Sequence, residues 1–352
     1  GMLTTATLLT MALAGNVQAA EIRSVGPDGE AAVDASTIEL TDDQIAQIKE
    51  GGYTAAICLH YGGNDWSTSQ QKGLEDTFGE LGIEIVAVTD ANFSAETQVS
   101  NIETVMAKKP DILVSIPTDA TATADAYKQA AAAGIKIVFM DQRANGLEAG
   151  KDYVSVVSAD NYGNGYASGT VLGDALGGKG KVAMVYYDAN FAPTNQRDEG
   201  FRDAMKNYPD IEIVTEQGFT DESGCAEQGD AILTQFPNID GIYASWDVPM
   251  EGVLSAVRAA GMEGKVTLAC NDLGNNVARE IASGNIAGGG AQMPYDQGVA
   301  EAKLAALALL GEETPSYVAV PAETVTHENV LEAYTDVYHV ETPDWLKEAY
   351  VE

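Results

Sequence analysis

Basic side chains are scarce in this sequence of 352 residues. The chain has 19 Lys and Arg against 53 Asp and Glu, which gives a formal net charge of −34. Nucleic acids and anionic membrane surfaces attract basic proteins, because Lys and Arg neutralise their phosphates. We therefore expect neither a nucleic acid nor a membrane surface as a partner, and we interpret the charge as a source of solubility.

Cysteine and histidine are also rare, with three residues of each. Cys58, Cys225 and Cys270 show no CxxC spacing, so they predict neither a metal site nor a redox pair. We expect three buried free thiols, although the sequence leaves a Cys58–Cys270 disulfide open. The histidines have no nucleophile nearby in the chain, and HExxH, calcium-loop and GxxxxGK[ST] motifs do not occur. We therefore expect no cofactor, no metal and no catalytic residues.

The N-terminal apolar segment is short. Residues 2–20, MLTTATLLTMALAGNVQAA, have the pattern of a secretory leader that ends in small residues at a cleavage site. The segment is too short and too rich in Thr and Ala to predict a membrane span. We interpret residues 1–20 as the remnant of a signal peptide and expect a soluble, periplasmic protein.

A polar segment and one helix are expected before the main fold begins. Residues 21–40 contain the turn signal Gly26-Pro27-Asp28-Gly29 and predict a mobile lead-in. Thr41 is a good helix N-cap with acidic residues after it, and Gly51 is expected to end that helix. Residues 21–52 are therefore set apart as an N-terminal lead-in and helix.

Apolar runs and helical segments alternate from residue 53 onward. The expected strands are 53–59, 83–89, 111–116, 135–140, 153–158, 181–187, 211–217, 241–245, 265–270 and 286–292. The expected helices between and after them are 67–81, 94–108, 120–133, 162–177, 196–207, 223–236, 248–260, 273–283 and 296–310. Strands that are nearly continuous apolar runs are typical of parallel sheets covered by helices on both faces. The fold class is therefore doubly wound, Rossmann-like α/β.

Ten strands fit two lobes of five strands better than one large sheet. The chain offers three crossings between such lobes, at 158–161, 291–294 and 318–326. Three crossings form a hinge, because a few residues can absorb a rotation while each core moves as a rigid body. The expected N-terminal lobe consists of residues 53–159 and 293–321, and the expected C-terminal lobe consists of residues 160–292 and 322–352.

Polar and aromatic side chains gather where the expected strands end. Ligands of open parallel sheets bind outside the carboxyl ends of the strands. Asp, Asn and Gln bind hydroxyl groups through hydrogen bonds, and an aromatic ring covers the C–H face of a small polyhydroxylated ligand. The candidate ligand-binding residues are Asn64, Asp65, Trp66, Asp141, Gln142, Asn195, Arg197, Trp246, Asp272 and Gln292.

Some of these residues have a purely structural interpretation as well. Trp66 could pack the first helix onto its sheet, and Arg197 could form an ion pair below the cleft. Asp141 and Asp272 could cap the helices that follow them. The same two residues could also be the acid pair of a glycosidase, although they lie in no recognisable catalytic motif.

A series of motifs occurs along the chain in a specific order. The motifs are NDWSTSQQKG, IPTDA, FMDQ, SADNYGNG, NQRDEGF, ASWD, ND and AQMPYDQG. In this order the chain resembles the periplasmic sugar-binding proteins of bacterial ABC importers, of the ribose-binding type, over residues 53–330. The resemblance implies a type I periplasmic binding protein fold that captures a sugar or sugar alcohol and delivers it to an ABC-type membrane permease. We accordingly expect a monomeric binding protein and no enzyme.

The resemblance also implies roles for five residues. Asn64 would hydrogen-bond hydroxyl groups of the sugar, and Trp66 would stack on its ring. Asp141 and Asp272 would be the hydroxyl-binding carboxylates of the two lobes. Gln292 would be the hinge amide that contacts the ligand.

The chain departs from the ribose-type pattern at several positions. Gln142 and Asn195 each stand where the family has an Arg, and Ile116 and Trp246 each stand where it has an Asn. Fewer guanidinium donors and more apolar area make ribose doubtful as the ligand. A different pentose, a hexose or an acyclic polyol fits the sequence at least as well as ribose.

Three other functions stay open from the sequence. A receptor for nucleosides or signalling furanoses would share the fold. The effector domain of a lactose-repressor-type regulator would need a basic helix-turn-helix before residue 53, where this chain is acidic. A glycoside hydrolase would turn over glycosides and would exclude the receptor interpretation.

Overall fold

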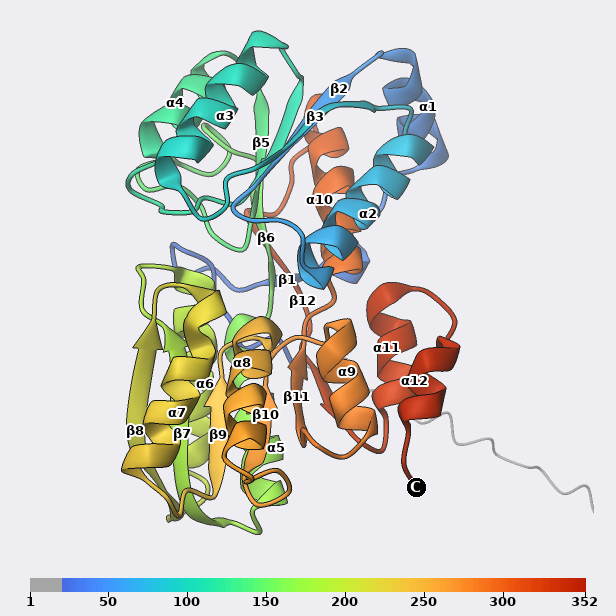
Figure 1. Ribbon diagram of the computed structural model, residues 1–352. Helices are drawn as coiled ribbons and strands as arrows, with labels where there is room; N and C mark the ends of the chain where they lie inside the picture. The colour runs from blue at the N-terminus through green and yellow to red at the C-terminus, as the bar shows by residue number, and fades with distance from the viewer. Residues whose placement is uncertain (1–20) are drawn as a thin grey trace, which may run out of the picture.

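The computed structural model describes residues 21–352, and the signal peptide expected for residues 1–20 lies outside the described residues. Two lobes lie one above the other, and each is built from a sheet with helices on both faces (Figure 1). The ten strands and nine helices expected from residue 53 onward all form, with small shifts at their ends. The doubly wound α/β fold class is therefore confirmed.

The N-terminal lobe is built on a seven-stranded parallel sheet with the order β1-β12-β6-β5-β4-β2-β3. Its strands are β1 (Val33–Asp34), β2 (Thr54–Leu59), β3 (Glu84–Asp90), β4 (Ile112–Ser115), β5 (Lys136–Met140), β6 (Ser155–Ala159) and β12 (Tyr317–Val320). Its helices are α1 (Asp42–Glu50), α2 (Asp65–Glu80), α3 (Ala95–Ala107), α4 (Ala124–Ala132) and α10 (Pro294–Leu309). One core lies between the sheet and α2 and α10, and a second core lies between the sheet and α3 and α4.

The C-terminal lobe is built on a six-stranded sheet with the order β13-β11-β10-β9-β7-β8. Its strands are β7 (Lys179–Tyr187), β8 (Asp210–Phe219), β9 (Gly241–Ala244), β10 (Thr267–Cys270), β11 (Gly288–Ala291) and β13 (Glu323–Thr326). Its helices are α5 (Asn161–Ala175), α6 (Ala192–Met205), α7 (Cys225–Gln235), α8 (Asp247–Ala259), α9 (Asn275–Ala282), α11 (Val330–Tyr338) and α12 (Asp344–Ala349). The strand β13 pairs antiparallel with β11, so this sheet is mostly and not wholly parallel.

The chain passes between the two sheets three times. It leaves the N-terminal sheet after β6, returns after β11, and leaves again between β12 and β13. The third crossing was expected as a plain connection over 318–326, but it carries a short strand of each sheet with only residues 321–322 between them. The lobe boundaries that we drew from the sequence stay a proposal.

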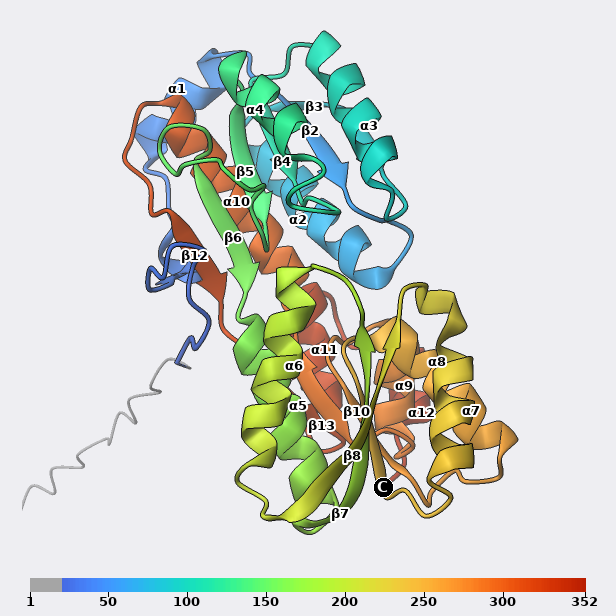
Figure 2. The same cartoon turned by 90° about the vertical axis from the view of Figure 1, so that its left-hand side faces the viewer.

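The lead-in before α1 is packed against the two lobes, so the expectation of a mobile segment is wrong. The Ser24 side chain is buried, and its backbone N–H and hydroxyl donate to Asp160 Oδ1 at 2.9 Å and 2.7 Å. The short strand β1 adds to the edge of the sheet beside β12, where the blue N-terminal segment runs in Figure 2. The turn at Gly26–Gly29 forms as expected, and Thr41 caps α1 through a capping box.

Glycines let two helix pairs approach each other closely. A Cβ atom at Gly73 of α2 would lie 2.2 Å from the backbone oxygen of Tyr295 at the start of α10. A Cβ atom at Gly165 of α5 would lie 1.8 Å from the backbone oxygen of Arg197 in α6. Gly73 of the NDWSTSQQKG motif and Gly165 of the SADNYGNG motif are therefore explained by backbone contact between helices.

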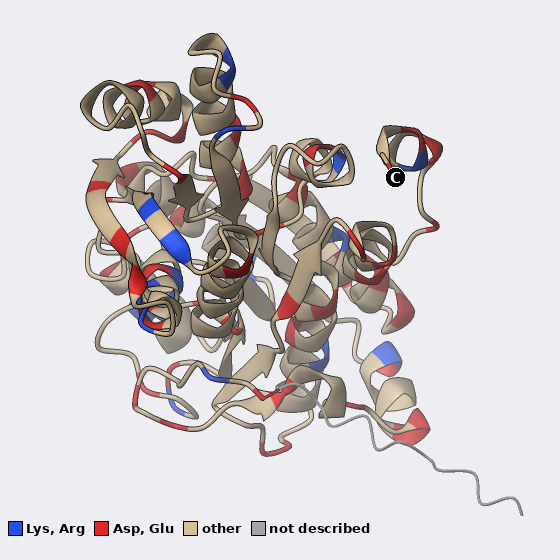
Figure 3. Cartoon of the chain, turned by 90° about the horizontal axis from the view of Figure 1, so that it is seen from below, with Lys and Arg blue, Asp and Glu red and all other residues tan. Residues whose placement is uncertain are grey.

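Two further observations bear on the general properties of the chain. Cys58, Cys225 and Cys270 are buried free thiols, and the Cys58–Cys270 disulfide that the sequence left open does not form. Acidic residues are spread over many helices and loops of the face seen in Figure 3, with few basic residues between them. Among residues 21–352, no helix has the length and apolar character needed to cross a membrane.

One buried carboxyl group lies at the α2–α10 contact. Glu301 on α10 is fully buried and accepts a hydrogen bond from the Gln70 side-chain amide on α2. Glu301 Oε2 and Gln70 Oε1 are buried, and neither has a hydrogen-bond partner among the described residues. Burial raises the pKa of Glu301 well above its usual range, and the negative charge of Asp141 raises it further. Burial disfavours the charged carboxylate, so the neutral form suits this contact.

The substitution Glu301→Gln is expected to change how stability depends on pH. A carboxyl group with a raised folded-state pKa contributes stability that is complete below its unfolded pKa of about 4.3 and is lost as the pH rises through the folded value. At pH 8 the variant should therefore melt about 2–4 °C higher than the parent, the shift that ~1 kcal/mol produces. At pH 4 the variant and the parent should melt at the same temperature.

Thermal melts followed by circular dichroism across this pH range provide the measurement. Glu312→Gln, at an exposed position just after α10, removes the same charge and serves as the control. A constant difference between Glu301→Gln and the parent at every pH would contradict a protonated Glu301.

Candidate functional site

A cavity lies between the two lobes, outside the carboxyl ends of both sheets. Its empty space is about 400 Å³, including the part that opens to solvent. Its walls are formed by His60, Tyr61, Trp66, Phe93, Ile116, Asp141, Tyr187, Phe191, Thr194, Arg197, Trp246, Asp272 and Gln292. A wider depression at the amino ends of β5 and β6 lies away from these groups.

Six of the ten candidate residues line this cavity together. They come from the N-terminal lobe, the C-terminal lobe and the second crossing, and they are Trp66, Asp141, Arg197, Trp246, Asp272 and Gln292. Their assignment as ligand-binding residues stays a prediction. The structure supports it by bringing residues that are up to 226 positions apart into one space.

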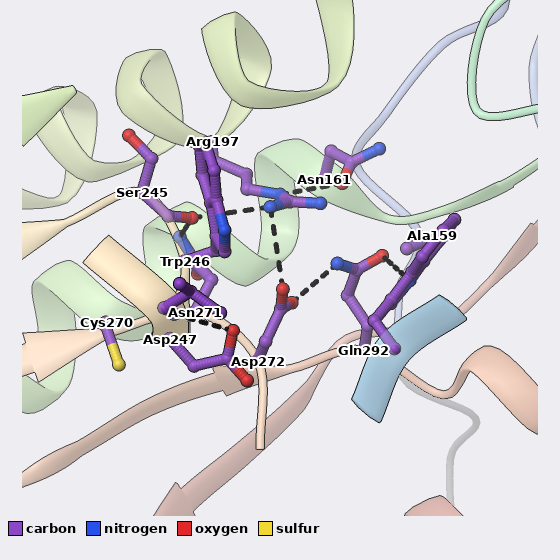
Figure 4. A network of polar contacts seen from close by, with 12 residues as sticks. Ala159, Asn161, Arg197, Ser245, Trp246, Asp247, Cys270, Asn271, Asp272 and Gln292 are labelled. Atoms are coloured by element: carbon purple, nitrogen blue, oxygen red, sulfur yellow. Dashed lines mark hydrogen bonds and ion pairs between the residues drawn. The ribbon is translucent and has the colours of Figure 1, made fainter. Parts of the chain in front are cut away.

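A chain of polar contacts links the lobes across the hinge. The Trp66 indole N–H donates to Gln292 Oε1 at 3.1 Å, and the Gln292 amide donates to Asp272 Oδ1 at 2.5 Å. The other Asp272 oxygen lies 3.9 Å from the Arg197 guanidinium. Figure 4 shows Asp272 between Arg197 and Gln292. One carboxylate therefore connects the C-terminal lobe to the hinge and, through it, to the N-terminal lobe.

Arg197 is both a cavity residue and a fixed structural residue. Its Nε–H donates to Asn161 Oδ1 at 3.0 Å, and its Nη1 donates to the backbone oxygen of Ser245 at 3.3 Å. The side chain is buried, yet it lines the cavity. The two interpretations of Arg197 from the sequence thus describe the same side chain, because its structural contacts hold the guanidinium beside the cavity.

Asp141 and Asp272 occupy equivalent places in the two lobes. Asp141 directly follows β5, and Asp272 lies two residues beyond the end of β10. Both have a left-handed backbone conformation, with φ of 59° for Asp141 and 73° for Asp272. Such a conformation is uncommon for residues other than glycine and is often found at functional sites. Neither residue caps a helix, since the N-cap of α9 is Gly274. The helix-capping interpretation of these two residues is therefore wrong.

Asp141 is held by three donors that all reach the same oxygen. Ser158 Oγ, the Ala159 backbone N–H and the Gln297 side-chain amide lie 3.0, 3.2 and 3.3 Å from Asp141 Oδ1. Among the described residues no such donor occupies Oδ2, which is left available to a ligand. The carboxylate is thus oriented before any ligand arrives.

Burial dominates the electrostatics of the cavity. It raises the pKa of both Asp141 and Asp272, and the nearby Arg197 lowers the pKa of both. One guanidinium therefore faces two desolvated carboxyl groups. Hydroxyl groups of a ligand would supply hydrogen bonds that stabilise the charged carboxylates.

Four candidate residues do not line the cavity. Asn64 is the N-cap of α2, and Asn195 lies in the first turns of α6. Asp65 accepts a hydrogen bond at 2.7 Å from the Asn275 backbone N–H at the start of α9, in the opposite lobe. The Gln142 oxygen accepts one at 3.1 Å from the Ala192 N–H, also in the opposite lobe. Asp65 and Gln142 therefore bridge the lobes directly.

Sequence reasoning missed most of the aromatic rings of the cavity. His60 and Tyr61 follow β2, Phe93 lies three residues beyond β3, and Tyr187 ends β7, with Phe191 just after it. The signal was present, because all five lie at the carboxyl ends of strands. The search for hydroxyl-binding groups selected carboxylates, amides and tryptophans and did not select the other rings as ligand-binding residues.

No metal site accompanies the cavity. Within the part of the chain that the structure describes, no group of three or more His, Cys, Asp or Glu side chains could hold a metal ion. What the arrangement offers is a set of oriented hydrogen-bonding groups and aromatic rings around one shared space.

Comparisons with known proteins agree with this geometry. The ribose import binding protein of Salmonella typhimurium is 24% identical over 272 residues, which cover 77% of this chain and 90% of the relative. The D-ribose/D-allose-binding protein of Pseudomonas aeruginosa is 29% identical over 273 residues, with 74% and 83% covered.

Solved structures show the same fold. A periplasmic solute-binding protein of an ABC transporter from Actinobacillus succinogenes, with bound D-allose, has a TM-score of 0.73 and 28% identity, covering 79% of this chain and 99% of its own. A solute-binding protein from Agrobacterium vitis, bound with α-D-tagatopyranose, has a TM-score of 0.75 and 26% identity, covering 83% and 100%.

The family model of the periplasmic binding protein domain matches residues 55–313. The chain therefore belongs to the periplasmic binding protein family, and within it the chain is similar to the ribose-type sugar-binding proteins of ABC transporters.

Proposed function

We propose that this protein captures one monosaccharide or sugar alcohol between its lobes in the periplasm and delivers it to the permease of an ABC importer. Of the relatives and structural neighbours described above, one is a ribose-binding protein, one is a D-ribose/D-allose-binding protein, and two have D-allose or α-D-tagatopyranose bound. The oriented carboxylates and aromatic rings of the cavity suit a ligand of the same class.

The observation that carries the proposal is the origin of the cavity walls. Trp66 and Asp141 come from one lobe, Arg197 and Asp272 from the other, and Gln292 from a crossing between them. A ligand can contact all of these groups together only when the lobes are closed. Binding therefore shifts the population toward the closed form, which a permease can distinguish from the open form.

The roles of the side chains follow from their contacts. Asp141 and Asp272 each accept hydrogen bonds from ligand hydroxyl groups, while Arg197 donates to a ligand oxygen. Trp66 has its indole N–H engaged by Gln292, so its ring is fixed and offers its carbon surface to the sugar ring.

Ligand-induced stabilisation tests the proposed function. In a thermal-shift screen of pentoses, hexoses and polyols, at least one sugar or polyol should raise the melting temperature of the parent protein. For that ligand, Asp141→Asn should weaken binding by about 10- to 100-fold, because a hydrogen bond to a charged group contributes roughly 1.5–3 kcal/mol. Asn tolerates the left-handed backbone at this position, so the ligand-free variant should melt no lower than the parent.

The control is Asp43→Asn, which removes the same charge from an exposed position on α1. It should bind as the parent does. Parent-like binding by Asp141→Asn would contradict the role of Asp141, and a screen without any hit would contradict the proposed function.

The contact between Asp65 and α9 predicts a second effect. Asp65 joins the lobes at the positive end of a helix without touching the cavity, so we infer that it stabilises the closed form. Asp65→Ala should weaken ligand binding by about 10-fold through the closing equilibrium alone, the effect expected from the loss of ~1.4 kcal/mol.

Stopped-flow measurement of dissociation should show that most of the change lies in a faster ligand release. Asp43→Ala serves as the control, because it removes one negative charge from an exposed position. Unchanged release from the Asp65 variant would show that this bridge does not hold the lobes together.

A further inference from the structure

The lead-in segment contacts both lobes at the hinge. Residues 23–34, here called the strap, run beside β12 between the two lobes (Figure 2). The family model matches only from residue 55 onward, so the strap lies outside the matched domain. The residues that line the cavity do not include any of the strap. Its contacts are therefore not explained by ligand binding.

One end of the strap binds the start of α5 in the C-terminal lobe. The Arg23 backbone N–H donates to Asp160 Oδ2 at 2.9 Å, beside the two bonds that Ser24 makes to Asp160 Oδ1. Ser24 Oγ also accepts a hydrogen bond from the Tyr162 N–H at 3.0 Å. The Arg23 guanidinium carbon lies 4.0 Å from the centre of the Tyr166 ring, which is the geometry of a cation–π interaction. This end of the strap therefore holds the first crossing and the helix that follows it.

The other end of the strap is fixed to the N-terminal lobe. The Asp28 carboxylate accepts two hydrogen bonds from the Arg143 guanidinium, each at 2.8 Å, in the loop after β5. A bidentate pair of this kind holds both partners in one orientation. At the end of the strap, Val33 and Asp34 pair with β12 in the N-terminal sheet. The strap is thus bound to one lobe at each end.

Between its ends the strap spans a depression formed by both lobes. Val25 and Pro27 line this depression with Gln142 of the N-terminal lobe and with Ala192 and Gln196 of the C-terminal lobe. Gln142 and Ala192 also form one of the direct bridges between the lobes. The strap therefore crosses the same gap as that bridge, and opening of the lobes on this side would pull its two ends apart.

The link between the two ends has little slack. Only residues 25–27 lie between them, and they belong to a tight turn. In this turn the Gly26 N–H donates to the backbone oxygen of Glu30 at 2.8 Å, and the Gly29 N–H donates to that of Gly26 at 3.0 Å. A movement that separates the ends of the strap would therefore break the turn or the contacts at one of the ends.

We propose that the strap is a latch that stabilises the closed arrangement of the lobes. Its contacts with both lobes are complete in the closed form, and opening costs part of them. Because the strap does not line the cavity, it shifts the closing equilibrium without contacting a ligand. The inference goes beyond the proposed function and does not depend on which ligand the protein binds.

Counting closed molecules in the absence of ligand tests the latch. Dyes attached at Glu103→Cys on α3 and at Glu227→Cys on α7 lie at exposed positions of different lobes. Single-molecule fluorescence energy transfer between the dyes reports whether the lobes are open or closed. The ligand-free parent should show both forms, and a parent without closed molecules would overturn the inference.

The double variant Arg23→Gln, Ser24→Ala weakens the end of the strap that holds α5. It removes the charge over the Tyr166 ring and the hydroxyl between Asp160 and the Tyr162 N–H. Because a cation–π contact and side-chain hydrogen bonds are lost together, the ratio of closed to open molecules should fall about fivefold or more.

The variant Asp28→Asn weakens the other end of the strap. The amide cannot form the charged bidentate pair with Arg143. Asp28 is exposed, so the effect should be smaller, and the ratio of closed to open molecules should fall about twofold. An unchanged or increased ratio in either strap variant would overturn the inference, because a latch needs both of its ends.

Matched controls remove the same kinds of contact within the C-terminal lobe alone. Arg279→Gln removes a guanidinium that lies 4.9 Å from the Trp345 ring centre, and Glu263→Gln removes a bidentate pair with Arg258. Both controls should keep the ratio of the parent. Equal losses in the controls and in the strap variants would overturn the latch, since a general loss of stability would then explain them. Failure of the latch leaves the proposed function standing, because no sugar enters this experiment.

Discussion

The burial of Asp272 constrains the rest of the site. A carboxylate in a cavity closed off from water is unfavourable unless charged or hydrogen-bonding groups surround it. Arg197 from α6 and the Gln292 amide from the second crossing provide these groups. Arg197 is held in turn by Asn161 and Ser245, and Gln292 by Trp66. The requirement to satisfy one buried charge therefore positions elements of both lobes and the hinge.

The closed arrangement also relies on contacts that need no ligand. Asp65 reaches the start of α9, and Gln142 reaches the backbone of Ala192 in the opposite lobe. Rings from both lobes meet around the cavity, as His60 and Phe191 do. These contacts lower the free energy of closing, so the ligand has to supply only part of the difference between the open and closed forms. Ligand affinity is then tuned by residues outside the cavity as well as by its walls.

Much of the fold could be predicted because parallel strands buried on both faces leave a strong pattern of apolar runs. The third crossing was harder, since β12 and β13 have four residues each and are separated by only two. The packing of residues 21–40 could not be predicted, because it depends on the distant partner Asp160 and on an open sheet edge beside β12. The carboxyl-end rule placed Asp141, Asp272 and Gln292 in one cavity. It could not distinguish them from Asp65, whose direction is set by the start of α2 and by α9 across the cleft.

The central claim is that the two lobes close around a ligand that both of them contact. Distance measurement between nitroxide labels at Glu103→Cys on α3 and Glu227→Cys on α7 tests it most directly, because both positions are exposed and lie on different lobes (Figure 2). The three native cysteines are buried and should stay unlabelled. Addition of a sugar that the protein binds should shift a broad distribution of distances between the two labels to a shorter, narrower one. An unchanged distribution at saturating ligand would contradict closure around a shared site.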